Sequence, residues 1–207
     1  MKKVFKTICM IFISIIFVFN LSKVPTYLEF KSYLKTNYPA KDFNVSWIKY
    51  NFIYGGSFSK VVCTADNTTF QINKGKTYIS DNYYLTKNTN AMNKILRENL
   101  YSENEELNSL VRSVYGSSNS LNHDQVKDYK QIVDSIGISF YSDKIINKRH
   151  IAQLIHEVIE VYKRNNIKFN QISTDFEMDG HVYSIVLKDE QLGYDVNAIV
   201  SSIRNIK

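Results

Sequence analysis

The hydrophobic residues begin with an almost unbroken run near the amino terminus. Ile8–Phe19 is apolar except for Ser14, and the lysines Lys2, Lys3 and Lys6 precede it without any acidic residue. A helix that is apolar on every side has no face for solvent, which disfavours a surface helix of a soluble protein. A cationic start followed by an apolar segment of this size is typical of a secretory signal.

The residues that follow this run favour an uncleaved anchor over a cleaved signal. Residues 17–21 are mostly bulky, whereas signal peptidase requires small residues at its cleavage site. As a helix, residues 7–21 span roughly 22 Å at 1.5 Å per residue. A hydrocarbon core is about 30 Å thick, so flanking residues and snorkelling lysines complete the span. We expect residues 1–22 to form a single transmembrane helix and the remaining chain to lie outside the cell membrane. If the signal is cleaved, we expect the protein to be secreted.

Residues 23–86 predict a helix followed by an antiparallel meander. Pro25 is typical of a first helical turn, and apolar residues then recur at helical spacing up to Tyr38-Pro39. Segments rich in aromatic and β-branched residues follow, separated by turn residues at Gly55-Gly56, Asp66-Asn67 and 73–76. We expect an amino-terminal domain of one helix on a sheet of three or four strands.

Residues 87–136 predict a helical connector. The residues at helical spacing are Met92, Ile95, Leu96 and Leu100, then Leu107, Leu110, Val111 and Val114, and finally Val126, Tyr129, Val133 and Ile136. Gly116 and Gly137 stand just beyond the second and third groups, where glycine commonly ends a helix. This pattern predicts three helices.

Residues 137–207 predict a domain with the element order β-α-β-β-α. A short strand ISFYS precedes a helix over 148–165, and two alternating segments form a hairpin about Asp179-Gly180. Asp195 is placed to cap a final helix. The order is that of a ferredoxin-like unit without its last strand. The predicted fold class is therefore α+β, with a transmembrane helix in front.

One stretch of the amino-terminal domain resembles a known family. The segment TYLEFKSYLKTNYPAKDFNVSWIKYNFIYGGSFSKVVCTADNTTFQI, followed by SDNYY, is similar to the YfjL-like family of membrane-anchored proteins from Gram-positive bacteria. The resemblance covers Tyr27–Tyr84 and rests on packing motifs. It implies an anchor, a helix with a sheet, a second α/β domain and an outward location, and it implies no catalytic residues.

Charge and cysteine content narrow the classes of partner. The formal net charge is +6, and three of the cations precede the apolar run. No run of basic residues with interleaved aromatic residues occurs, which argues against nucleic acid as a partner. A weak attraction to anionic lipid or wall polymer remains open. Cys9 lies in the apolar run and Cys63 stands alone, so the outer part has no intramolecular disulfide and Cys63 is expected to be a buried residue.

Two segments resemble metal sites without completing them. DFEMDG, residues 175–180, begins like a calcium loop, but the position that should supply a bidentate carboxylate is Val186. His156 begins half of a zinc-protease helix, but the second histidine is replaced by Glu160. A hairpin turn and a solvated helix face are the favoured interpretations, and we predict no metal, no cofactor and no catalytic residues.

The polar residues selected as a candidate ligand site are Asp66, Asp81 and Asn82, near predicted strand ends. The alternative is that they are ordinary turn formers. From the anchor, the free sheet edge and the missing catalytic motifs, we predict a non-enzymatic extracytoplasmic module that binds an envelope protein or peptide. The alternatives are a module that binds anionic cell-wall polymer and, third, a hydrolase assembled from residues distant in the sequence.

Overall fold

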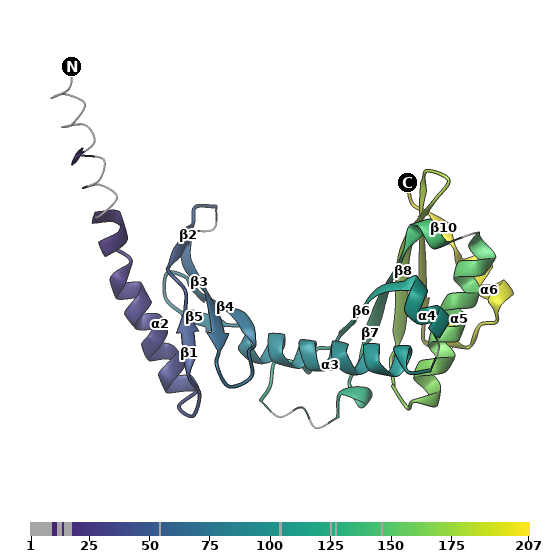
Figure 1. Cartoon of the computed structure of the whole chain (residues 1–207), viewed down its shortest axis with the longest axis horizontal. Coiled ribbons are helices and arrows are strands. Elements are labelled where there is room, and N and C mark those ends of the chain that lie inside the picture. The colour runs from purple at the N-terminus through teal and green to yellow at the C-terminus, as the bar shows by residue number, and fades with distance from the viewer. Residues whose placement is uncertain are drawn as a thin grey trace, which may run out of the picture. The chain divides into compact units, whose positions relative to one another are not determined.

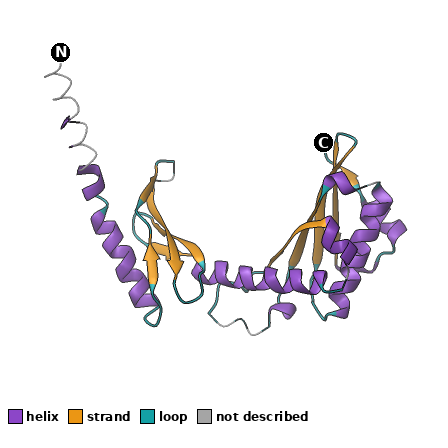
Figure 2. Ribbon diagram, viewed as in Figure 1, coloured by secondary structure: helices purple, strands orange, loops and turns teal. Residues whose placement is uncertain are grey.

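The computed structural model describes residues 10–11, 14, 18–53, 55–103, 105–124, 126, 128–145 and 147–207. The chain divides into an amino-terminal unit, Met1–Thr86, and a carboxyl-terminal unit, Lys87–Lys207, which we describe separately (Figure 1). Helices and strands are both present in quantity, which confirms the α+β class (Figure 2). The predicted transmembrane segment falls mostly outside the described residues. Within the part that is described, no helix is long and apolar enough to cross a membrane.

The amino-terminal unit is a helix on an antiparallel sheet. Helix α2 is Val24–Asn37, and the strands are β1 (Phe43–Val45), β2 (Lys49–Asn51), β3 (Gly56–Cys63), β4 (Thr69–Lys74) and β5 (Ile79–Asp81). Both β1 and β2 pair with β3, which pairs with β4 and through it with β5. The expected helix and antiparallel meander are confirmed, but the sheet has five strands where three or four were predicted. The segment predicted as one first strand is two short strands.

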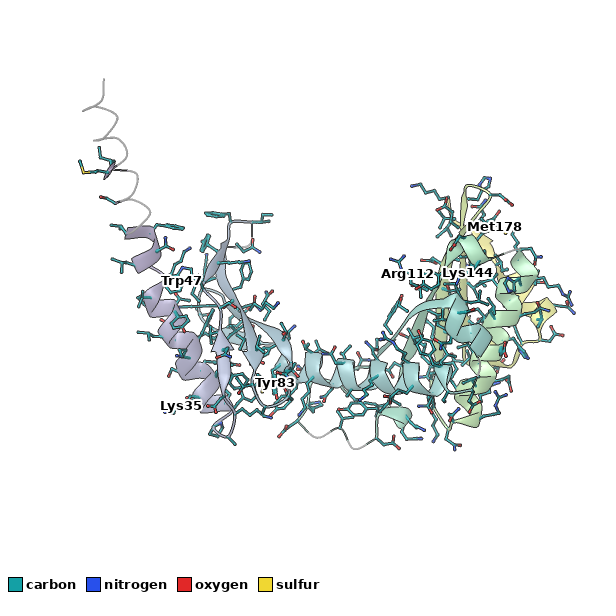
Figure 3. All side chains as sticks on the ribbon, in the orientation of Figure 1. Lys35, Trp47, Tyr83, Arg112, Lys144 and Met178 are labelled. Carbon is teal, nitrogen blue, oxygen red and sulfur yellow. The ribbon has the colours of Figure 1, made fainter. Side chains whose placement is uncertain are left out.

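The core of this unit forms between α2 and one face of the sheet. Phe30 and Leu34 of α2 pack with inward residues of β3 and β4, among them Val61 and Ile72. Tyr83, labelled in Figure 3, belongs to the same cluster and is fully buried, and its ring makes edge contacts with the rings of Tyr38 and Phe43. The fully buried Cys63 confirms the expectation for this residue.

The expected helical connector is only partly correct. Helix α3, Tyr83–Tyr101, starts earlier than predicted, and α4 is the short helix Glu105–Leu110. The prediction that the second helix continues to Val114 is wrong, because Val111–Ser117 form strand β6. A register shift between Val111 and Ser113 lets both Val111 and Val114 face the core. A bulge of this kind gives a strand the three-residue spacing that otherwise indicates a helix.

The third predicted helix is also wrong. Residues 129–131 form a single 3₁₀ turn, η1 (Tyr129–Gln131), and β7 begins at Ser135 and runs to Phe140. Gly137 lies inside β7 and does not end a helix. A Cβ atom at Gly137 would lie 2.1 Å from the ring of Tyr115 on the paired strand β6, so a larger residue at this position would displace that half-exposed ring.

The remaining elements follow the predicted order. They are η2 (Ser142–Lys144), α5 (Lys148–Arg164), β8 (Gln171–Met178), β9 (His181–Lys188), η3 (Asp189–Gly193), α6 (Val196–Ser202) and β10 (Arg204–Asn205). The helix, the hairpin and the Asp195 cap, which accepts from the Ala198 amide, are confirmed. The sheet order is β10-β9-β8-β7-β6.

The ferredoxin-like expectation is wrong in two respects. The parallel strands β7 and β8 pair directly, whereas a split unit places another strand between them. A short last strand, β10, is present and pairs with β9. Helix α5 therefore makes a simple crossover between two neighbouring parallel strands and buries its apolar face, from Ile151 to Tyr162.

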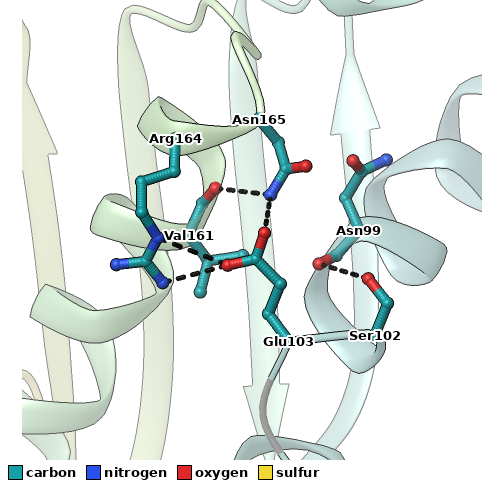
Figure 4. Close-up of polar contacts among 6 residues, drawn as sticks. All are labelled: Asn99, Ser102, Glu103, Val161, Arg164 and Asn165. Carbon is teal, nitrogen blue, oxygen red and sulfur yellow. Dashed lines mark hydrogen bonds and ion pairs between the residues drawn. The ribbon is translucent and has the colours of Figure 1, made fainter.

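Polar contacts join α5 to the chain that follows α3 within this unit. The Glu103 carboxylate accepts hydrogen bonds from the Arg164 guanidinium at 3.0 Å and from the Asn165 side-chain amide at 2.6 Å (Figure 4). These hydrogen bonds lower the pKa of Glu103, with Asn165 contributing most. The carboxyl end of α5 is thereby connected to residues some sixty positions earlier in the chain.

Candidate binding surface

Asp81, one of the three predicted ligand residues, is engaged by groups of its own unit. Its carboxylate accepts hydrogen bonds from the hydroxyls of Tyr33 and Tyr38, each at 2.9 Å, and from the Tyr83 amide at 2.8 Å. Burial, together with the neighbouring Asp81 carboxylate, raises the pKa of Tyr33 to about 12 and raises the pKa of Tyr38 further above its usual range. Asp81 thus connects α2 to the beginning of α3.

Asp66 lies in the turn between β3 and β4 and contacts the other end of the same tyrosine. The Tyr83 hydroxyl donates to the Asp66 carboxylate at 2.5 Å, and the Thr68 amide donates at 3.1 Å. Burial alone would raise the pKa of Asp66, but these donors outweigh it and lower the pKa to about 2. Since hydrogen bonds favour the charged form, this carboxylate is ionised at neutral pH.

Asn82 contacts the edge of the neighbouring strand. Its side-chain oxygen accepts from the Gln71 amide at 2.8 Å, and its own amide donates to the Gln71 carbonyl at 3.3 Å. The structure thus brings Asp66 and Asp81 to the two sides of Tyr83 and leaves Asn82 in the strand ladder. Each of the three residues has a partner that stabilises the unit, which favours the turn-forming interpretation over a ligand site.

The two segments that resemble metal sites also have structural partners. Asp179 and Gly180 have φ angles of 54° and 74° and form the two-residue turn between β8 and β9, which confirms the hairpin. His156 Nδ1 lies 3.2 Å from the Tyr194 carbonyl oxygen, and Glu160 pairs with Lys163 at 3.0 Å. Among the described residues, no three histidine, cysteine or acidic side chains gather as metal ligands would.

The sheet of the amino-terminal unit has a second, outer face that sequence reasoning did not single out. Cross-strand pairing places Lys49, Phe58, Asn73 and Ser80 in one row, and Lys60 beside Gln71 in the next. These side chains lie outside the core cluster that α2 covers on the inner face. The outward positions of β1 to β5 include lysines and amides but no carboxylate.

A shallow pocket of about 430 Å³ lies on this outer face. Lys49, Lys60, Gln71 and Asn82 line it, together with Phe58. Lys49 and Lys60 are exposed and form no ion pair with any described residue. The Gln71 side-chain amide donates to the Asn73 side-chain oxygen at 2.5 Å, which orients both amides. The surface offers two cations, oriented amides and an aromatic ring, a set suited to an anionic, hydroxyl-rich ligand.

The sheet edges offer less to a peptide than the sequence suggested. β1, β2 and β5 have three residues each and β10 has two. On the edge strand β6, the Gly116 amide already donates to the Asn93 side-chain oxygen at 2.8 Å. Strand addition requires a row of free backbone groups, so these edges are short templates.

Comparisons of the chain with models of protein families, with curated proteins and with solved structures gave no match. The resemblance to the YfjL-like family therefore stays an expectation, and the assignment of function depends on the residues themselves.

Proposed function

We propose that the protein is a membrane-anchored, extracytoplasmic and non-enzymatic binding module whose outer sheet face binds an anionic polymer of the cell wall. The single observation that carries the proposal is the carboxylate-free face on which the cations Lys49 and Lys60 form no ion pair with any residue that the structure describes. Phosphate or carboxylate groups of a polymer pair with such cations. The oriented side-chain amides accept hydrogen bonds from the polymer's hydroxyls or donate hydrogen bonds to them.

The location in this proposal is supported by the amino-terminal sequence. The lysines before Ile8–Phe19 keep the amino terminus in the cytoplasm, which leaves both folded units outside. A reporter fused after Lys207 that is active only in an extracytoplasmic compartment is the expected result. Activity of the reporter only inside the cell would contradict this part of the proposal.

Co-sedimentation of the detergent-solubilised full chain with purified cell wall tests the binding. We expect binding at low salt that is lost at high salt, because exposed charges are screened over shorter distances as ionic strength rises. Wall from which the anionic polymer has been extracted is expected to bind little protein. Absence of sedimentation with intact wall at low salt would contradict the proposal.

A pair of charge-matched variants locates the surface. Lys49→Gln/Lys60→Gln removes two cations from the outer face, and Lys31→Gln/Lys35→Gln removes two exposed cations from α2. We expect the first variant to lose binding and the second to retain it. Equal loss in both variants would indicate attraction by net charge alone.

The protein- or peptide-binding alternative predicts a different result. A peptide added to a sheet edge gains affinity from backbone hydrogen bonds, so its binding would persist at high salt. The short edges and the occupied Gly116 amide make it the weaker candidate.

A further inference from the structure

The two ends of the amino-terminal sheet differ sharply in polarity. At the end that holds the β2–β3 turn, Phe52 is 81% and Ile53 is 86% exposed, and Tyr50 is half exposed with its ring 4.9 Å from that of Phe52. The pairing of Ser57 with Lys74 places the β4–β5 turn, with the exposed Tyr78, at this same end. We name Tyr50, Phe52 and Ile53 the apolar tip. Large exposed apolar side chains grouped in this way mark an interaction site.

The opposite end of the sheet is polar. The β3–β4 turn carries Thr64, Asp66 and Asn67, and Asp42 lies beside it, since the Thr64 amide donates to the Asp42 carbonyl. Strand β3 separates the two ends by about 25 Å at 3.3 Å per residue. This asymmetry is not expected of a unit that water surrounds on all sides. It is expected of a unit that contacts an apolar phase with one end.

The apolar tip lies beside the end of the predicted anchor. Phe19, Lys23, Tyr50 and Phe52 line one pocket of about 330 Å³. The Lys23 ammonium lies 4.5 Å from the centre of the Phe19 ring. Phe19 closes the apolar run at the amino terminus, so the chain that would leave the membrane and the exposed turn line the same pocket.

Trp47 adds an aromatic group of the kind that favours the membrane–water interface. Its indole N–H donates to the Asn20 side-chain oxygen at 3.1 Å, and its ring lies 5.9 Å from that of Tyr27 on α2. Trp47 is half exposed, and its hydrogen bond to Asn20 places it at the end of the predicted membrane span. Tryptophan and tyrosine are enriched at the level of lipid headgroups because one end of each side chain is apolar and the other polar.

Two backbone amides of the β2–β3 turn donate hydrogen bonds within the turn itself. The Ile53 amide donates to the Asn51 side-chain oxygen at 3.0 Å, and the Gly55 amide donates to the Asn51 carbonyl at 2.9 Å. Unsatisfied backbone groups are costly away from water, so internal partners make shallow burial of a turn feasible. One residue, Asn51, satisfies both of these donors.

The charge of the surrounding chain fits an anionic surface. Residues 1–28 and 43–65 contain no aspartate or glutamate, whereas both stretches contain lysines, including Lys23 and Lys49. These two stretches hold the predicted anchor and the apolar tip. Basic residues next to a membrane span are attracted to anionic lipid headgroups.

We propose that the apolar tip inserts into the headgroup region of the bilayer beside the anchor and binds anionic phospholipid there, so that the amino-terminal unit contacts the membrane at two points. This proposal rests on the anchor in the proposed function and adds a second membrane contact to it. The tip supplies apolar burial, and Lys23, which lines the same pocket as Phe52, supplies charge at the headgroup level.

The experiment uses the full chain reconstituted in vesicles of phosphatidylglycerol and phosphatidylcholine, with part of the lipid brominated near the headgroup end of its acyl chains. Bromine quenches tryptophan emission at contact, and Trp47 is the single native tryptophan. Phe52→Trp/Trp47→Phe places the reporter in the tip. Ala65→Trp/Trp47→Phe places it at an exposed position of the polar end and is the matched control. Vesicle flotation is measured for each variant.

We expect loss of emission for Phe52→Trp/Trp47→Phe and unchanged emission for the control. We also expect Phe52→Ser/Ile53→Ser to reduce the quenching of the native Trp47 while flotation is retained. Unquenched emission of Phe52→Trp/Trp47→Phe in protein that still floats would overturn the proposal and leave the anchor intact. Protection of the tryptophan at position 52 from aqueous iodide, without quenching by brominated lipid, would also overturn the proposal, because protein and not lipid would then cover the tip. Failure of the unmodified chain to float would instead overturn the anchor.

Discussion

The two units of this protein are stabilised in different ways. The carboxyl-terminal unit buries a large and mostly aliphatic core, in which α5 alone contributes Ile151, Leu154, Ile155, Val158 and Ile159. The amino-terminal unit has a smaller core that is rich in aromatic rings, and its tyrosine hydroxyls bind the carboxylates of Asp66 and Asp81. A small sheet with one covered face buries limited apolar area, so hydrogen bonds to charged groups take a larger part in its stability.

This contrast explains where ligands are expected. The carboxyl-terminal unit places most of its strong apolar residues inside, whereas the amino-terminal unit leaves Phe52 and Ile53 exposed at one end and Lys49 and Lys60 on its outer face. Residues that do not contribute to a core are available for an external surface. The unit with the smaller core is therefore the one with the candidate contacts to membrane and polymer.

The largest expected effect comes from a cavity in the aliphatic core. Ile155→Ala removes a fully buried side chain from α5 and is expected to destabilise the carboxyl-terminal unit by about 2–5 kcal/mol. Unfolding in denaturant followed by circular dichroism measures this loss. Trp47 fluorescence reports the amino-terminal unit alone and is expected to keep its midpoint. The half-exposed Val186→Ala is the control, and a matching shift of the Trp47 midpoint would contradict independent stabilisation of the two units.

The hydroxyl network of the amino-terminal unit gives the next effect. Tyr83→Phe keeps the buried ring but removes the donor to Asp66, and a loss of about 1–2 kcal/mol is expected because a hydrogen bond to a charged group disappears. The Trp47 fluorescence midpoint in denaturant is the measurement. Tyr115→Phe, at an exposed hydroxyl of the other unit, should leave this midpoint unchanged. An unchanged midpoint for Tyr83→Phe would show that aromatic packing alone stabilises the unit.

The stability of the amino-terminal unit is expected to depend on pH through Asp66, which has no counterpart among the core residues described in the other unit. The folded pKa of Asp66, about 2, lies below its ordinary value of 3.8, so the unfolded state binds more protons between these values. Stability is fully present above about pH 4 and declines as pH falls toward 2. Unfolding followed by Trp47 fluorescence across this range should show the decline. Tyr83→Phe should make it shallower, since Asp66 then regains a pKa nearer its ordinary value.

The smallest effect is expected at the surface of the carboxyl-terminal unit. Glu103→Gln removes the charge that pairs with Arg164 but keeps an acceptor for Asn165. Exposed ion pairs contribute little because water screens them, so the circular dichroism midpoint should shift less than for either preceding substitution. A shift as large as that of Ile155→Ala would show that this contact, and not the aliphatic core, limits the stability of the unit.

Local patterns predicted the elements whose residues interact mainly with near neighbours in the sequence. The helical spacing of Ile151 to Tyr162 identified α5, and Asp179-Gly180 between alternating segments identified the β8–β9 hairpin. Pro25 and Tyr38-Pro39 located α2 to within a residue or two. Turn chemistry and a 3.6-residue period depend on the chain within a few positions, which is why sequence alone was sufficient here.

The errors occur where distant segments determine the conformation. Val111 and Val114 have helical spacing, but a bulge against β7 makes them neighbours on one face of a strand. Gly137 has the sequence character of a helix end, but it lies in strand β7, where it pairs with Tyr115 of β6 and the Tyr115 ring lies close to it. A bulge and a close approach are properties of a pair of strands, so neither can be predicted from one of them.

The candidate site divides in the same way. The amino acid sequence determined the apolar amino-terminal run, the absence of acidic residues from 1–28 and 43–65, and the turn at Gly55-Gly56. Only the tertiary structure assigned Asp66 and Asp81 to the two sides of Tyr83, aligned Lys60 with Gln71 on an outer face and brought Phe52 beside Phe19. Composition and turns are local properties of a chain, whereas the surface that a side chain shares with others depends on which strands pair and in which register.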